Sequence, residues 1–329
     1  MKLGAYTACL HDLPLPEALR VLADLGLDGA EINSGGFVAS PRLPVQELLA
    51  SEQARIEYLG LYDGAGVTLT ALNCNGNPLD PGPAGSKHAQ DIYTSIELAA
   101  QLGVKRVVTM SGAPGSEATS TLPVWNVLPW HSAFLEIQDY QWNEVAIPFW
   151  KKVQAFAADH DVLVCLEMHP GNVVFNPRTM ERLATEINAT HIGAEMDPSH
   201  LFWQQIDPTE ATRSLGSLVY NAAAKDTRIN PAARINGTID DSFTRVSEDD
   251  PRWLSLGGPH SLSGWPTDPS WDFVAVGRGH DLGWWTGFCD ALAAIDPDMA
   301  VNIEHEDLEL DQMEGLRYAA ETLKKAAGR

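Results

Sequence analysis

One pattern repeats along the whole chain of 329 residues: a short apolar segment is followed by a longer amphipathic one. Eight of the apolar segments mix β-branched with small residues and have the length of buried strands. The expected strands are residues 2–7, 29–33, 67–73, 104–110, 161–167, 191–197, 218–226 and 299–304. Strands that alternate with helices form parallel sheets, and eight such units close into a barrel. The sequence therefore predicts an α/β fold, a single (β/α)₈ TIM-barrel domain over residues 1–329.

Helices are expected between these strands, and two long insertions interrupt the pattern. After the first strand, Leu19, Leu22 and Leu25 recur at helical spacing, and Gly26 stops the helix. The other clear helices are residues 84–102, 144–158, 177–187, 281–295 and 311–327. The insertions, residues 111–139 after the fourth strand and 227–271 after the seventh, are rich in Gly, Pro and Trp. In a barrel such loops lie on the catalytic face, where long ones act as lids or partner surfaces.

Charge and cysteine usage exclude several functions. The 22 Lys and Arg residues against 44 Asp and Glu residues give a net charge of -22, which repels nucleic acid and anionic membranes. The shortage of cations and the lack of a Gly-rich phosphate loop favour a neutral polyol over a phosphorylated substrate. Four well-separated cysteines, no signal-peptide core and no apolar run of membrane-spanning length predict a cytoplasmic protein.

Four acidic residues mark the ends of expected strands: Glu31, Glu167, Asp197 and Glu304. In a barrel these positions converge on one mouth, where unneutralised carboxylates repel each other strongly. Each acid could instead have its own Arg, Lys or helix N-terminus, but nearby cations are few. A bound divalent metal is therefore expected. Oxygen-rich ligation favours Mn²⁺, Mg²⁺ or Co²⁺, and leaves Zn²⁺ open.

Histidines lie beside the same strand ends. They are His169 in LEMHPGN, His200 in MDPSH, His280 in VGRGH and His305 in NIEHED. A single loop histidine is more often a structural hydrogen-bonding residue, but four beside four acids favour chemistry. A neutral imidazole near a metal can move a proton from carbon, and we assign this role to His169.

The other site residues are assigned around this base. His200 and Lys225 are predicted to bind or polarise sugar oxygens, and Asn73, Glu31 and His305 to contact the substrate. Glu304 is expected to act in catalysis as well as on the metal.

These motifs resemble a known family. LEMHPGN, EMDPSHL, AAAKDT, VGRGHD and NIEHED are similar to the xylose isomerase-like TIM barrels, a superfamily of sugar isomerases and epimerases, over nearly the whole chain. ALNCNGNPL, RVVTMSG, DPSHLFWQQ and DPDMAVNIEHED most resemble the catalytic α subunits of bacterial C-glycoside deglycosidases. The resemblance implies that Glu167, Asp197 and Glu304 bind the metal, that His169 is the proton-transfer base, and that a small β subunit is a partner. Manganese is the expected metal.

The seventh strand departs from the family pattern. Relatives read HVHAKD there, and the second histidine binds the metal, whereas this chain has NAAAKD, with Asn221 and Ala223 in the histidine positions. His280 is the expected replacement ligand. The alternatives are three protein ligands plus water, or an amide oxygen from Asn221.

The chemistry implied by this resemblance is removal of a proton next to a sugar ketone. Expulsion of the group at C1 of a 3-oxo-glucoside would make the protein a lyase that cleaves carbon–oxygen or carbon–carbon bonds to an aglycone, and this interpretation is favoured. Reprotonation would make it a keto-sugar epimerase or isomerase. A third interpretation is a sugar-binding barrel without catalysis, which only the loss of the histidine at Ala223 supports. The many loop tryptophans either grip an aglycone or pack under the loops.

Overall fold

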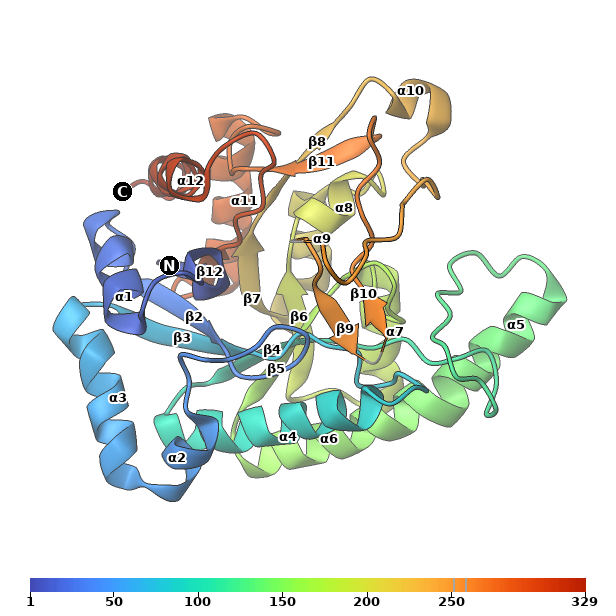
Figure 1. The fold of residues 1–329 in the computed structure, drawn as a ribbon, viewed down its shortest axis with the longest axis horizontal. Helices are drawn as coiled ribbons and strands as arrows, with labels where there is room; N and C mark the ends of the chain where they lie inside the picture. Colours follow the sequence, from blue (N-terminus) through green and yellow to red (C-terminus); the bar gives the residue numbers. More distant parts are fainter. Residues whose placement is uncertain (251, 258) are drawn as a thin grey trace.

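The computed structural model describes residues 1–250, 252–257 and 259–329. Eight parallel strands close into a barrel with helices around it (Figure 1), in the order β1-β12-β7-β6-β5-β4-β3-β2. The strands are β1 (Lys2–Tyr6), β2 (Gly29–Asn33), β3 (Thr68–Asn73), β4 (Arg106–Met110), β5 (Leu163–Glu167), β6 (Ile192–Met196), β7 (Val219–Ala224) and β12 (Ala300–Ile303). The predicted barrel is confirmed, and each barrel strand falls within a predicted segment.

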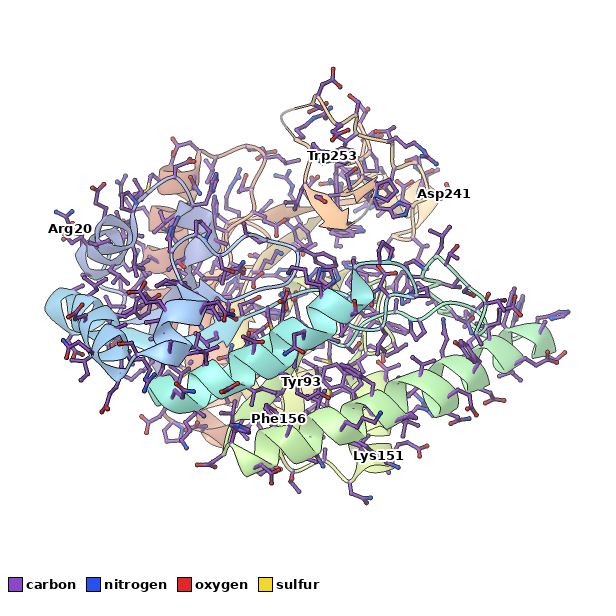
Figure 2. The ribbon with its side chains drawn as sticks, turned by 60° about the horizontal axis from the view of Figure 1, so that its bottom comes forward. Arg20, Tyr93, Lys151, Phe156, Asp241 and Trp253 are labelled. Carbon is purple, nitrogen blue, oxygen red and sulfur yellow. The ribbon has the colours of Figure 1, made fainter. Side chains whose placement is uncertain are left out.

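The longer helices cover the outside of the barrel because they bury an apolar stripe against it. In α1, for example, Leu15, Leu19 and Leu22 are buried. Tyr93 of α4 and Phe156 of α6 point toward one another (Figure 2), with ring centroids 5.1 Å apart. The helices are η1 (Thr7–Leu10), α1 (Leu15–Asp24), α2 (Val45–Ala50), α3 (Glu52–Ala65), α4 (Gly85–Leu102), α5 (Ser132–Asp139), η2 (Tyr140–Ala146), α6 (Ile147–Asp159), α7 (Pro177–Ile187), α8 (Ser199–Phe202), α9 (Pro208–Leu215), η3 (Gly216–Leu218), α10 (Ala233–Asn236), α11 (Leu282–Ile295) and α12 (Gln312–Ala326).

The two insertions contain regular structure that the sequence pattern did not indicate. The first ends in α5, which continues through the π-helix η2 into α6 and projects from the barrel (Figure 1). The second contains two antiparallel two-stranded sheets, β8 (Asp226–Ile229) with β11 (Trp271–Val274) and β9 (Ser255–Gly257) with β10 (His260–Ser261). Strands this short carry too few residues to show a period, so these segments read as loops.

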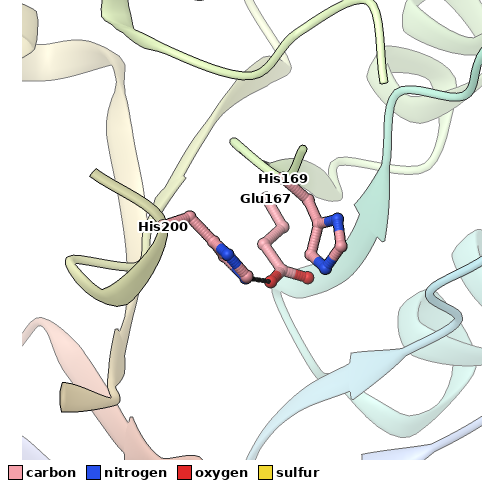
Figure 3. A group of neighbouring side chains, drawn as sticks. All are labelled: Glu167, His169 and His200. Atoms are coloured by element: carbon pink, nitrogen blue, oxygen red, sulfur yellow. Dashed lines mark hydrogen bonds and ion pairs between the residues drawn. The ribbon is translucent and has the colours of Figure 1, made fainter. Parts of the chain in front are cut away.

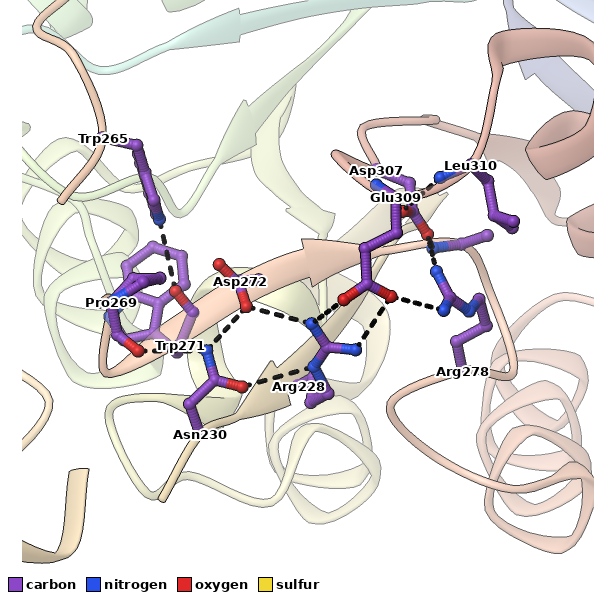
Figure 4. A network of polar contacts seen from close by, with 11 residues as sticks. Arg228, Asn230, Trp265, Pro269, Trp271, Asp272, Arg278, Asp307, Glu309 and Leu310 are labelled. Atoms are coloured by element: carbon purple, nitrogen blue, oxygen red, sulfur yellow. Dashed lines mark hydrogen bonds and ion pairs between the residues drawn. The ribbon is translucent and has the colours of Figure 1, made fainter. Parts of the chain in front are cut away.

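Two polar clusters fix the second insertion and its neighbours to the barrel. The buried carboxylate of Asp226 accepts hydrogen bonds from the backbone N–H groups of Gly277, Gly279 and His280, each 3.0 Å long. Arg228 donates to Asp272 and to Glu309, which lies in the loop after β12 (Figure 4). The long loops are therefore held by defined contacts at the barrel mouth. Among the described residues, no helix combines the length and apolar character needed to cross a bilayer.

Candidate metal centre

Three predicted acidic residues converge at the mouth of the barrel. Glu167 is the last residue of β5, while Asp197 and Glu304 each follow directly after β6 and β12. One carboxylate oxygen from each lies within 4.8 Å of the others. Glu167 and Asp197 are buried, and the side chain of Glu304 is 11% exposed. Parallel strands bring their carboxyl ends to the same end of a barrel, which is why residues far apart in sequence meet here.

Burial and mutual repulsion prevent these three groups from all being ionised without a cation. Burial raises the pKa of Asp197 to about 7, and the charge of Glu167 adds to this effect. Burial likewise raises the pKa of Glu304 well above its usual value. Burial also acts on Glu167, but the hydrogen bond from His200 and the nearby histidines and Lys225 outweigh it and lower the pKa to about 2. A divalent cation would allow all three carboxylates to ionise.

The buried Oδ2 atom of Asp197 supports this interpretation. It has no hydrogen-bond partner among the described residues, although His200 Nε2 lies 3.4 Å away without hydrogen-bond geometry. Unpaired buried carboxylate oxygens are costly, and a metal ion is one way to satisfy them. The residues present therefore fit a divalent metal, with Glu167, Asp197 and Glu304 supplying oxygen ligands.

Two histidines lie against Glu167 (Figure 3), with ring centroids 4.2 Å apart. His200 Nε2 is 3.1 Å from Glu167 Oε1, so this nitrogen carries the proton that the carboxylate accepts. Burial lowers the pKa of His200 to about 3, which keeps the ring neutral. His169 Nδ1 lies 2.7 Å from the carbonyl oxygen of Pro170 and must donate to it. This tautomer leaves a lone pair on His169 Nε2, available to a proton or a metal.

Histidine ligation is also geometrically feasible. Nitrogens of His169 and His200 and an oxygen of Glu167 form a second group within 4.8 Å. Because the neutral His200 ring donates from Nε2 to Glu167, the free lone pair that reaches this group belongs to His169.

Lys225 provides a fixed positive charge beside the acidic residues. It follows β7, is buried, and its Nζ atom lies 2.5 Å from Glu306 and 3.5 Å from Glu304. Burial lowers the pKa of this ammonium group, but the surrounding carboxylates outweigh burial and raise it. The ammonium also lies 4.2 Å from the ring centroid of Phe273. Lys225 is therefore charged and is held between carboxylates and an aromatic ring.

A cavity of about 360 Å³ opens above these groups. Its volume lies within the usual range for small-molecule sites. Its wall includes predicted residues, namely Glu167, His169, Lys225 and Glu304, together with Tyr6, Asn75, Asn77, Asn172 and Glu306. Asn75 Nδ2 donates to Glu167 Oε2 over 2.5 Å, which orients that carboxylate. Asn75 and Glu306 were not predicted, although each lies two residues beyond an assigned residue and thus on the same side of an extended segment.

Four expected substrate contacts do not line this cavity, and one of them is His200, which is 1% exposed and donates to Glu167. Glu31 is in the middle of β2 and not at its end, so its side chain lies inside the barrel, where Asn73 and Asn302 donate to it. Asn73 is occupied by this hydrogen bond, and neither residue lines the cavity. His305 packs tightly against Gly315 of α12, because neighbouring residues in an extended segment face opposite sides.

The structure also corrects the expected role of His280. Its Nδ1 atom lies 2.7 Å from Asp226, and its ring stacks on Phe202 at 3.6 Å between centroids. Neither metal-competent group within the described residues includes it. Because the loop that carries His280 is anchored to Asp226, its ring faces Phe202 and does not replace the missing β7 histidine. Ala223 stands in that position and offers no ligand atom.

Comparisons with known proteins define the class of the molecule. Residues 19–326 match the family described as "Xylose isomerase-like TIM barrel", and the chain belongs to that family.

One relative and two solved structures illustrate this membership. The uncharacterized protein YfiH of Bacillus subtilis is 36% identical over 329 residues, with 99% of each chain covered. The protein IolI, solved with a bound zinc atom, has a TM-score of 0.62 and 17% identity and covers 100% of this chain and 98% of its own. The 3-keto-D-glucoside 4-epimerase YcjR from E. coli has a TM-score of 0.59 and 14% identity, with 99% of each chain covered. At these identities the two solved structures show a shared fold.

Proposed function

We propose that this protein is a divalent-metal-dependent enzyme that removes the C2 proton of a 3-oxo-glucoside and then expels the group at C1. The observation that carries this proposal is the meeting of the carboxylates of Glu167, Asp197 and Glu304 at the mouth of the barrel. Glu167, Glu304 and His169, which has the free Nε2 lone pair, line the cavity there. The fold shared with a 3-keto-glucoside epimerase and with a zinc-binding barrel supports the substrate class and the metal.

In this proposal, the chain's own side chains carry out the proton transfers. His169 Nε2 accepts the proton from C2, because its Nδ1 proton is held by Pro170. Lys225 holds a sugar oxygen, and Asn75 keeps the Glu167 carboxylate in place. The electron pair of the broken C2–H bond forms a C1=C2 double bond, and the C1 group leaves with the bonding pair and takes up a proton. A bound divalent cation supplies positive charge that stabilises the negative charge developing on the ketone oxygen.

Epimerisation is the second candidate, and the position of Glu304 favours it. Glu304 faces the same cavity from another strand and could return a proton to the sugar. Both reactions begin with loss of the same C–H proton, so they are separated by their products. A lyase releases the aglycone and an unsaturated keto-sugar, whereas an epimerase gives a stereoisomer.

The decisive experiment is proton exchange at C2 of methyl 3-oxo-β-D-glucoside in D₂O with Mn²⁺, followed by NMR. We expect exchange with the wild-type protein, and its abolition in His169→Ala with bound manganese retained. His191→Ala is the matched control, because His191 precedes β6 at the opposite end of the barrel. The absence of both C2 exchange and methanol release with the wild-type protein would refute both enzyme proposals and favour a binding protein. Loss of manganese from His169→Ala would make His169 a ligand.

A protein partner belongs to the same proposal. The first insertion exposes large apolar side chains, including Leu128 at 72% and Trp130 at 90%. Exposed apolar groups of this size favour contact with another chain. Co-purification with a small subunit, and greater aglycone release in its presence, is the expected result. Full activity of the chain alone would contradict the need for a partner.

A further inference from the structure

A second cavity, of about 190 Å³, adjoins the metal cavity. Both insertions build it, and Pro170 lies in the walls of both cavities. We call it the tryptophan cavity, and it is defined by Trp125, Pro170, Trp203, Phe243, Trp265 and Trp271. Since His169 precedes Pro170, a substituent on a sugar held by His169 can extend past the proline into this second space.

The aromatic walls of the tryptophan cavity are fixed before any ligand binds. Trp203 and Trp271 are nearly parallel, with an interplanar angle of 5° and centroids 5.4 Å apart. Trp265 meets Trp271 edge-on at 4.9 Å. The indole N–H of Trp271 donates to Thr238 O, and that of Trp265 to Trp271 O. Rigid aromatic walls bind a flat ring at a small cost in conformational entropy.

The base of this cavity is attached to the ion-pair network of the β8–β11 sheet. Figure 4 shows Trp265, Trp271 and Pro269 beside Asn230, which donates to Asp272 and to Pro269 O. Arg228 links the same Asp272 to Glu309 beyond β12. The tryptophan cavity therefore has a fixed position relative to the loop that follows Glu304.

The polar groups in these walls indicate what the occupant carries. Trp125 Nε1, Trp203 Nε1 and Ser270 Oγ are buried and have no hydrogen-bond partner among the described residues, and all three residues line this cavity. Trp203 is 6% exposed and Ser270 2%. Buried donors without acceptors are unfavourable. A ring oxygen substituent would supply an acceptor, whereas a second sugar would bring more hydroxyl groups than these walls can satisfy.

We propose that the tryptophan cavity binds a single aromatic ring with an oxygen substituent, carried at C1 of the substrate as a phenolic aglycone. The orientation of the sugar rests on the proposed function. The volume of the tryptophan cavity agrees with this occupant. An apolar cavity of about 150 Å³ is known to hold benzene, and 190 Å³ leaves room for one substituent. The strongly acidic chain, with its net charge of -22, favours a neutral ring over an anionic one.

Two measurements test this proposal separately from turnover. The first is ¹⁹F NMR binding of 4-fluorophenol to the intact chain without metal or sugar. The second compares KM for phenyl and methyl 3-oxo-β-D-glucosides in the presence of Mn²⁺. We expect fluorophenol binding in the wild-type protein and a KM for the phenyl compound lower by about tenfold, as apolar pocket contacts typically provide.

The diagnostic variant fills the cavity without removing a wall. Ile239 lines the tryptophan cavity and is 78% exposed, so Ile239→Trp adds bulk there with little risk to folding. It should abolish fluorophenol binding and equalise the two KM values while leaving the methyl compound unaffected. Ile56→Trp is the matched control, because Ile56 is 59% exposed on α3 and lies outside the cavity.

The outcomes distinguish this inference from the proposed function. Fluorophenol binding that Ile239→Trp abolishes, with no turnover of either glucoside, would support the cavity and refute the enzyme proposal. Turnover of both glucosides with equal KM values, or fluorophenol binding that Ile239→Trp leaves unchanged, would overturn the cavity proposal and leave the enzyme proposal standing. Absence of fluorophenol binding in the wild-type protein would also overturn the cavity proposal.

Discussion

The protonation of Asp197 makes the stability of the metal-free protein depend on pH. Burial raises the pKa of this carboxyl from 3.8 to about 7. Between these pH values the folded protein holds a proton that the unfolded chain has released. The free energy of unfolding must therefore fall as the pH rises through this interval, and the fall must level off above pH 7.

The size of the effect follows from the same interval. One pH unit corresponds to about 1.4 kcal/mol, so the roughly three units between 3.8 and 7 give about 4 kcal/mol for Asp197. The substitution Asp197→Asn removes this titration, while the other buried carboxyls stay the same. The unfolding free energy of Asp197→Asn relative to the wild type should thus rise by about 1.4 kcal/mol per unit between pH 5 and 7.

Thermal unfolding of EDTA-treated protein at constant ionic strength measures this difference. As the pH rises from 5 to 7, we expect the melting temperature of Asp197→Asn to increase relative to that of the wild type by roughly 2 °C or more per pH unit. Asp268→Asn, at an exposed loop position, is the control and should follow the wild type. Saturating Mn²⁺ should stabilise the wild type increasingly as the pH rises, because ligation requires the ionised carboxylate.

Parallel pH profiles for the wild type and Asp197→Asn would refute this reasoning. They would mean that Asp197 is ionised throughout in the folded state, so that no cation is needed to neutralise the cluster. A stabilisation by Mn²⁺ that persists undiminished in Asp197→Asn would remove Asp197 from the ligand set.

Three further predictions concern the surroundings of the site. Asp226→Asn should lower the unfolding free energy by about 3 kcal/mol or more in urea titrations, because the buried carboxylate accepts three backbone N–H groups and the His280 ring; an unchanged midpoint would contradict this. His280→Ala should leave manganese affinity unchanged by calorimetry, and roughly a tenfold loss would restore His280 as a ligand. Lys225→Met should tighten manganese binding several-fold, because a fixed positive charge 3.5 Å from Glu304 is removed; weaker binding would show that Lys225 mainly holds the cluster together.

The repeated strand pattern in the sequence was enough to predict the barrel. The prediction failed where the direction of a single side chain decides whether a residue reaches the site. Eight apolar segments at regular intervals were enough for the barrel, and the acids at the ends of three of them reached the mouth. Glu31 was misplaced although the predicted strand coincides with β2, because Glu31 is the middle residue of that strand and does not reach its end. His305 was misplaced because it neighbours Glu304 and faces the opposite side. In both cases the strand itself was found, and the position and facing of a single residue along it decided whether its side chain reached the cavity.

His280 was misplaced for a different reason. The GRGHD motif and Asp226 are 54 residues apart in sequence, and only tertiary structure shows that the motif wraps around this carboxylate. The β8–β11 sheet could not be predicted either, because its pairing depends on Arg228 and Asp272 meeting across the second insertion. Contacts of this kind have no local signature.

A polar layer inside the barrel explains how the mouth can retain a cation without the β7 histidine. Asn221, in the first histidine position of the family pattern, donates 2.7 Å to Glu195 and 3.4 Å to Glu31. Burial raises the pKa of both acids, that of Glu31 to about 7. Apolar residues in these positions would make the folded protein at least as stable, so a contribution to stability does not explain why the layer is polar. The hydrogen bonds from Asn221 lower the pKa of both acids and so favour their ionised forms, which attract positive charge and would offset the neutral ligand lost at Ala223. Asn221→Leu should therefore weaken manganese binding even though Asn221 is not itself in either metal-competent group.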